Sequence, residues 1–211
     1  MAEEHIDLGS VEPASAPPAS AERRRLRSRT IVLGTLGLVS AVAVLAGCLF
    51  GARVIGQKDP SLTTPATIGA FTRDTRGGAQ TADDLSTALA AGVGLDRTVG
   101  AVYTDPAAAD RSVLLAAGIG LTLSPSSKLD RAMDLLSDST GGVTGRRGVD
   151  PGGLGGLMSC GTVPAASDAP AMTVCGWADY GSVAIALFPR RDISESATLM
   201  RQFRLAIQHR T

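Results

Sequence analysis

The sequence predicts an α+β protein in which an N-terminal transmembrane helix precedes one extracytoplasmic domain. We expect that domain to hold a mostly antiparallel sheet of about five strands and about three helices. An uncharged apolar run occupies residues 31–52, and helical and strand-like patterns alternate after it. The links between neighbouring strand patterns are short, whereas a parallel crossover needs a dozen or more residues. The 211 residues suffice for one ordinary domain with an anchor and tails.

The apolar run is the predicted transmembrane helix, so we expect residues 31–52 to contact membrane lipid. A helix rises 1.5 Å per residue, so a run of this length spans a hydrocarbon core about 30 Å thick. Five arginines lie at positions 23–29, whereas only Arg53 and Lys58 follow the run before Asp59. The positive-inside rule therefore places the N-terminus in the cytoplasm and the bulk of the chain outside.

The end of this run permits a second interpretation. Leu45-Ala46-Gly47-Cys48 resembles a bacterial lipobox, in which Cys48 would be lipidated and become the new N-terminus. Apolar residues follow Cys48 directly, where lipoproteins usually carry a polar tether, so the spanning helix is favoured. Both interpretations place the domain outside the cytoplasmic membrane.

The anchor divides the chain into four predicted parts. Residues 1–30 form a disordered cytoplasmic tail with the arginine cluster, since they are rich in Glu, Ala, Ser and Pro. Residues 31–52 form the transmembrane helix, residues 53–66 a linker, and residues 67–211 the extracytoplasmic domain.

Three helices are expected in the domain. Two begin at capping boxes, Thr81 to Asp84 and Ser127 to Asp130; Gly92 ends the first, and the second spans residues 128–138. The third spans residues 193–208 behind the cap Asp192-x-x-Glu195, with apolar residues at helical spacing. Five apolar segments predict the strands, namely residues 98–103, 112–117, 157–162, 172–179 and 182–188.

The chain between and after these strands contains turn signals. Asp179 to Ser182 is expected to form a tight turn between the last two strands. The glycine-crowded stretch from 141 to 156 lacks the GK[ST] ending of a phosphate loop, so it is interpreted as flexible turns.

Cys160 and Cys175 lie in neighbouring predicted strands. If these strands pair, the two Cα atoms come within bridging distance, and an extracytoplasmic compartment permits oxidation. Catalytic cysteine pairs usually lie close in sequence beside a group that stabilises the thiolate. We therefore expect a structural disulfide.

Strand alternation places Cys175, Trp177 and Asp179 on one face of the sheet. One interpretation packs Trp177 over the disulfide and leaves Asp179 in the turn. The alternative is a ligand or partner surface formed by Trp177, Asp179, Arg201 and Arg204.

Several motifs together resemble a known group of proteins. They are the turn Asp150-Pro-Gly-Gly-Leu-Gly-Gly156, Cys160-Gly161, Cys175-Gly-Trp-Ala-Asp179 and a last helix with Arg201 and Arg204. This pattern is similar to that of actinobacterial single-pass membrane or secreted proteins with no known activity, over residues 67–208. The resemblance implies a membrane or secreted location and the disulfide, and it implies no reaction.

The composition gives little reason to expect catalysis or nucleic-acid binding. Twenty basic residues balance 20 acidic ones, so no nucleic-acid partner is expected. Past the anchor, His209 is the only histidine and lies two residues from the end, where we expect fraying; no cofactor and no metal are expected. We expect a non-catalytic role in binding an envelope protein or ligand. The alternatives are a lipid-anchored carrier of a lipid or small molecule, and an enzyme with an unrecognised site.

Overall fold

The computed structural model describes residues 40–136, 142–165 and 170–210 of the chain. The chain forms two compact units, Met1–Phe50 and Gly51–Thr211. The predicted tail, residues 1–30, and the first part of the predicted transmembrane helix lie outside the described residues.

One helix among the described residues, Ser40–Gln57, is long and apolar enough to cross a membrane by length and composition. It continues past Ala52, where the prediction ended it, so the predicted linker is helical up to Gln57. The exposed Cys48 lies within this helix and its thiol is free.

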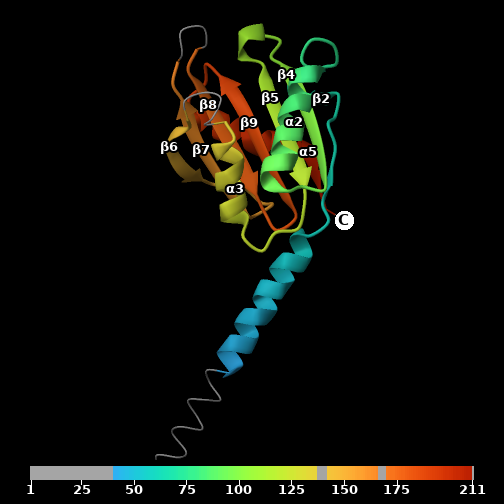
Figure 1. The fold of residues 1–211 in the computed structure, drawn as a ribbon, viewed down its shortest axis with the longest axis vertical. Helices are drawn as coiled ribbons and strands as arrows, with labels where there is room; N and C mark the ends of the chain where they lie inside the picture. Colours follow the sequence, from blue (N-terminus) through green and yellow to red (C-terminus); the bar gives the residue numbers. More distant parts are fainter. Residues whose placement is uncertain (1–39, 137–141, 166–169, 211) are drawn as a thin grey trace, which may run out of the picture. The chain divides into compact units, whose positions relative to one another are not determined.

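The domain is an α+β structure around one antiparallel sheet of eight strands, in the order β2-β3-β4-β5-β9-β8-β7-β6 (Figure 1). A separate two-stranded ribbon pairs β1 with β10. The strands are β1 (Ser61–Leu62), β2 (Thr67–Ile68), β3 (Phe71–Asp74), β4 (Arg97–Thr104), β5 (Val113–Ile119), β6 (Thr144–Val149), β7 (Leu157–Val163), β8 (Met172–Ala178), β9 (Ser182–Pro189) and β10 (Gln208–His209). The helices are α2 (Ala79–Val93), the single 3₁₀ turn η1 (Ala109–Arg111), α3 (Pro125–Asp134) and α5 (Ile193–Ile207).

Helices cover both faces of the sheet, because each strand of its centre is apolar on both sides. Helices α2 and α3 pack on one face through a core that includes Leu89 and Met133. Helix α5 packs on the other through Met200 and Phe203. The Phe203 ring makes edge contacts with Tyr103 at 5.1 Å, Phe71 at 5.5 Å and Phe188 at 6.5 Å between centroids. The result is a three-layer arrangement with two separate hydrophobic cores.

The five predicted strands are present as β4, β5, β7, β8 and β9, and the predicted count of about five was too low. The missed strands of the main sheet are β2, β3 and β6, which lie at its two edges. Strand β6 lies in the stretch interpreted as flexible turns. Its sequence, TGRRGV, carries no alternation of apolar residues, because as an edge strand it buries little of either face.

The predicted starts of two helices were wrong. Helix α2 begins at Ala79 and α3 at Pro125, and neither has a side-chain cap at its N-terminus. Ahead of α2, the Asp74 carboxylate instead accepts backbone hydrogen bonds from three consecutive residues of the entering loop. The third cap is confirmed, since Asp192 accepts a hydrogen bond of 2.8 Å from the backbone N–H of Glu195.

Helix α2 also passes through Gly92, where the prediction ended it, and stops at Gly94 in the left-handed conformation. A side chain at position 92 would meet Leu135, so the glycine lets α2 approach the end of α3. The sequence alone does not distinguish this packing role from a helix stop.

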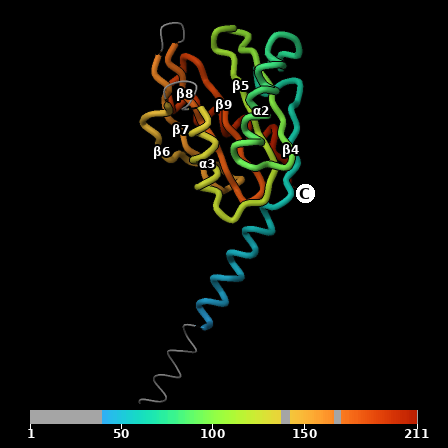
Figure 2. Tube along the Cα trace, in the orientation of Figure 1, coloured from blue at the N-terminus to red at the C-terminus, as the bar shows by residue number. Residues whose placement is uncertain are grey.

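The two ends of the domain meet in the ribbon of β1 and β10. Ser61 pairs with His209 and Leu62 with Gln208, and the C-terminal mark lies beside the teal segment that contains β1 (Figure 2). The His209 ring is 3.1 Å from the Thr63 hydroxyl. The expectation of a frayed histidine was therefore wrong.

Gly100 in β4 lies directly against the backbone of α2. A Cβ there would be 2.2 Å from the Ala82 carbonyl oxygen, which is backbone and cannot rotate away. We expect Gly100→Ala to lower the free energy of unfolding by about 1–3 kcal/mol, as overpacked cores do. Gly148→Ala in β6 is the matched control, because a Cβ there meets nothing within 4 Å. Urea denaturation of both variants checks this, and equal stabilities would contradict the close contact.

Candidate functional site

Three of the four residues of the predicted ligand surface, Trp177, Asp179 and Arg204, come together inside the protein, whereas Arg201 contacts Asp150 and Thr198 instead. Trp177 and Asp179 are fully buried, and Arg204 is almost fully buried. Arg201 is the only one of the four that retains appreciable contact with solvent. This geometry agrees with the interior interpretation of Trp177, which lies in one core cluster with Cys160 and Cys175.

Asp179 is the acceptor at the centre of this buried cluster. Its Oδ1 accepts hydrogen bonds from the backbone N–H groups of Gly181 at 2.9 Å and Ser182 at 2.8 Å, and from the Ser182 hydroxyl. Its Oδ2 accepts from Arg204 at 2.9 Å and from Gln208 and Arg210 at 2.7 Å each. The predicted tight turn is confirmed by the bond from the Asp179 N–H to the Ser182 carbonyl, at 2.9 Å. Both carboxylate oxygens are thus fully used inside the domain.

Arg204 connects this carboxylate with the core. Its guanidinium carbon lies 5.5 Å from the centre of the Trp177 ring, a cation–π distance. Its Nε donates to the Gln208 side chain at 2.8 Å. Burial lowers the pKa of Arg204 below its usual value, and attraction to Asp179 opposes that effect. The Asp179 carboxylate therefore compensates a cation that would otherwise be costly to bury.

Three arginines hold the loop from Asp150 to Gly156 through its carbonyl oxygens. Arg204 donates to Gly155 at 2.7 Å and to Pro151 at 3.3 Å. Arg210 donates to Leu154 at 2.7 Å, and Arg201 donates to Asp150 at 3.3 Å. This glycine-rich loop carries the motif noted in the sequence, and its carbonyls are held by arginines of α5 and by Arg210, which follows β10. Its predicted role as a flexible turn does not fit this degree of attachment.

No family model, curated protein or solved structure matches this chain. The resemblance to actinobacterial membrane and secreted proteins therefore stays a prediction.

The disulfide between Cys160 and Cys175 is present, and it joins β7 to β8. The two residues are directly opposite in the antiparallel register, with Cα atoms 4.1 Å apart. Both are fully buried in the α5-side core. The bond thus braces the strand pair that leads into the turn at Asp179.

Sequence reasoning missed Gln208 and Arg210, which complete the set of donors to Asp179. The available signal was a run of polar residues at the end of an otherwise amphipathic helix, where solvent contact is the ordinary interpretation. Only the return of this segment to the β8–β9 turn makes these side chains interior.

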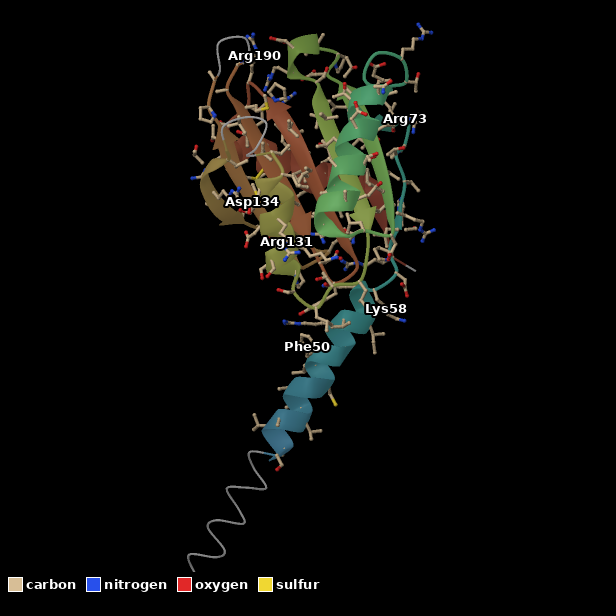
Figure 3. The ribbon with its side chains drawn as sticks, in the orientation of Figure 1. Phe50, Lys58, Arg73, Arg131, Asp134 and Arg190 are labelled. Atoms are coloured by element: carbon tan, nitrogen blue, oxygen red, sulfur yellow. A yellow bond between two sulfur atoms is a disulfide. The ribbon has the colours of Figure 1, made fainter. Side chains whose placement is uncertain are left out.

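Besides a hollow of about 340 Å³ lined by Ser61, Leu62, Arg97, Thr98, Val99 and Ile119, two larger hollows lie on the domain. The first, the distal groove, has a volume of about 550 Å³ and is lined by Arg147, Thr162, Ala171, Met172, Thr173, Arg190, Arg191, Asp192 and Ile193. The second, the helix-end pocket, has a volume of about 530 Å³ and is lined by Arg53, Gln57, Leu123, Ser124, Pro125, Ser126, Gly155, Gly156, Leu157 and Tyr180. Arg190, which lines the distal groove, and Lys58, which follows Gln57 of the helix-end pocket, are at opposite ends of the domain (Figure 3).

The titratable groups of the described residues do not gather at a metal site. Within residues 40–136, 142–165 and 170–210, no group of three or more His, Cys, Asp or Glu side chains is arranged to hold an ion.

Proposed function

We propose that this protein is a membrane-anchored, non-catalytic binding domain, with its N-terminus in the cytoplasm and its α+β domain outside the cytoplasmic membrane. The Ser40–Gln57 helix and the buried disulfide support this location, since disulfides persist in oxidising compartments. The arginine cluster at residues 23–29 supports the orientation.

One observation supports the binding role: the most deeply buried charged groups bind other groups of the domain and so stabilise the fold. Asp179, Arg204 and Arg210 bind one another and the glycine-rich loop. Arg191 is held in the same way by Asp105, 2.7 Å away, and by Glu195. Such groups rigidify a scaffold, and a rigid scaffold presents its exposed side chains to a partner at low entropic cost.

The distal groove is the surface that we assign to the partner. Arg147 lines it, is exposed, and forms no ion pair with any residue described by the structure. Arg190 lines the groove too, and its link to Asp110 at 3.0 Å is a surface ion pair with both side chains more than half exposed. Because such pairs contribute little stability, a partner carboxylate can replace Asp110. The groove therefore favours an acidic segment of an envelope protein.

Site-specific photocrosslinking in native membranes tests this role. A photoreactive phenylalanine analogue replaces Thr162 in the groove or, as a control, Asp84 on the exposed side of α2. We expect a discrete adduct from position 162 that is absent from position 84. Arg147→Glu should remove this adduct, whereas Arg131→Glu on α3 should leave it unchanged.

Two outcomes would contradict the proposal. Identical adduct patterns from positions 162 and 84 would mean that the groove has no partner of its own. An adduct that persists in Arg147→Glu would mean that the partner is not recognised by charge.

A further inference from the structure

The end of the domain that carries the helix-end pocket is unusually apolar for a surface. Beyond the N-terminal helix, the large apolar side chains most exposed among the described residues are Leu121, Leu123, Leu157 and Leu205. Leu123 and Leu157 line the pocket and are 72% and 44% exposed. Leu121, two residues before Leu123, is 64% exposed. Exposed apolar groups that cluster in this way mark an interaction site.

The chain itself places this pocket next to the membrane anchor. Arg53 lines the pocket, and it directly follows the uncharged run that ends at Ala52. The pocket therefore begins where the apolar segment ends, whatever the direction of the helix. The level in a bilayer at which such a segment ends is the headgroup region.

Contacts within the Gly51–Thr211 unit hold Gln57, a residue of the pocket lining, against the β8–β9 turn. The Gln57 side chain accepts a hydrogen bond of 3.3 Å from the backbone N–H of Tyr180. A Cβ on Gly181 would lie 2.2 Å from the Gln57 carbonyl oxygen, so the glycine permits a direct approach of the helix end to the β8–β9 turn. Gln57 is thus held against the turn that also contains the Asp179 cluster.

The pocket combines polar and apolar groups that match the headgroup and the acyl region of a phospholipid. Arg53 supplies a cation and Ser124 and Ser126 supply hydroxyl donors, all of which suit a phosphate diester. Leu123 and Leu157 suit the glycerol and upper acyl region. One wall, Gly155 and Gly156, belongs to the loop held by Arg204 and Arg210, so the pocket is pre-formed on that side.

We propose that the helix-end pocket binds the headgroup of an anionic glycerophospholipid of the anchoring bilayer, with Leu121, Leu123 and Leu157 inserted among the lipids around it. This inference rests on the membrane anchor of the proposed function and adds a specific lipid contact to it. It gives the domain one orientation on the bilayer surface, in which the distal groove faces the partner.

Fluorescence of the full-length protein in phosphatidylglycerol–phosphatidylcholine vesicles tests the contact. Cys48→Ser removes the free thiol, and single cysteines are then labelled with an environment-sensitive dye as Leu121→Cys, Ala109→Cys or Leu45→Cys. Ala109 belongs to η1 at the opposite end of the strands, and β4 alone separates the two ends by about 23 Å at 3.3 Å per residue. We expect a blue-shifted emission at position 121 that nitroxides near the headgroups quench. The dye at 109 should remain unquenched, and that at 45 should be quenched by nitroxides deep in the acyl chains.

The three positions separate the two hypotheses. If the dye at position 121 gives a water-like, unquenched emission while the dye at 45 is quenched, the lipid contact of the pocket is contradicted and the membrane anchor is retained. If the dyes at both 121 and 45 are unquenched, the membrane anchor and the lipid contact of the pocket are both contradicted.

Native mass spectrometry tests the headgroup. We expect phosphatidylglycerol to remain bound to the wild-type protein in preference to phosphatidylcholine, and Arg53→Gln to abolish this preference. Arg131→Gln removes an exposed arginine of α3 outside the pocket and should retain it. Equal retention of the two lipids by the wild type, or an unchanged preference in Arg53→Gln, overturns the headgroup site.

Discussion

Replacement of Asp179 by asparagine is expected to lower the free energy of unfolding by about 3–5 kcal/mol, the usual cost of breaking a buried ion pair from one side. Asp179 is fully buried and accepts from Arg204, Arg210 and Gln208. Without its charge, Arg204 remains a buried cation with no compensating anion. Urea denaturation of the full-length, oxidised protein in detergent, followed by the fluorescence of Trp177, measures the change.

Asp134→Asn is the matched control. Asp134 pairs with Arg146 at 2.6 Å, but its side chain is 63% exposed, so the loss should stay below about 1 kcal/mol. Adding Arg204→Met to Asp179→Asn should recover part of the stability, because the unpaired buried cation is then removed. If Asp179→Asn were no more harmful than Asp134→Asn, the cluster would not have the structural role assigned to it.

Loss of the disulfide is expected to have the second largest effect. The bond joins cysteines 15 residues apart, and closing a loop of that length stabilises a fold by about 3 kcal/mol in the chain-entropy model. We expect the combined change Cys160→Ala and Cys175→Ala to lower the urea midpoint correspondingly. Reductant should destabilise the wild-type protein and have no effect on this variant.

Cys48→Ala provides the control for that experiment. Cys48 is exposed in the N-terminal helix and forms no disulfide, so its loss should change neither the midpoint nor the response to reductant. A wild-type protein whose stability did not respond to reductant under unfolding conditions would contradict a stabilising bridge.

The sequence predicted the central strands and the last helix because local pattern and tertiary environment agree there. Strand β9 is apolar throughout since both of its faces are covered, and α5 has both a cap at Asp192 and a regular apolar stripe. Strand β6 was missed because its pairing with β7 depends on neighbours, as its own residues bury little. The starts of α2 and α3 were misplaced because capping boxes are common by chance, and the entering loops decide where the helices begin.

The candidate site was predicted in part. The disulfide followed from two cysteines in adjacent strands, and alternation correctly placed Trp177 and Asp179 on the face that carries it. The burial of Trp177 agrees with one of the two interpretations, whereas the burial of Asp179 was not predictable from local pattern. It depends on α5 folding back over the sheet, which brings Arg204 and Arg210 to a carboxylate 25 and 31 positions earlier.

The closure of the domain by its last residues affects the order of events during biosynthesis. Strand β1 directly follows the anchor helix but finds its partner only in Gln208 and His209, and Asp179 receives Arg204 and Arg210 from the same late segment. As a ribosome delivers the chain N-terminus first, neither connection can form until residues 204–210 have been synthesised. Until then, the α5 side of the sheet stays uncovered in the nascent domain.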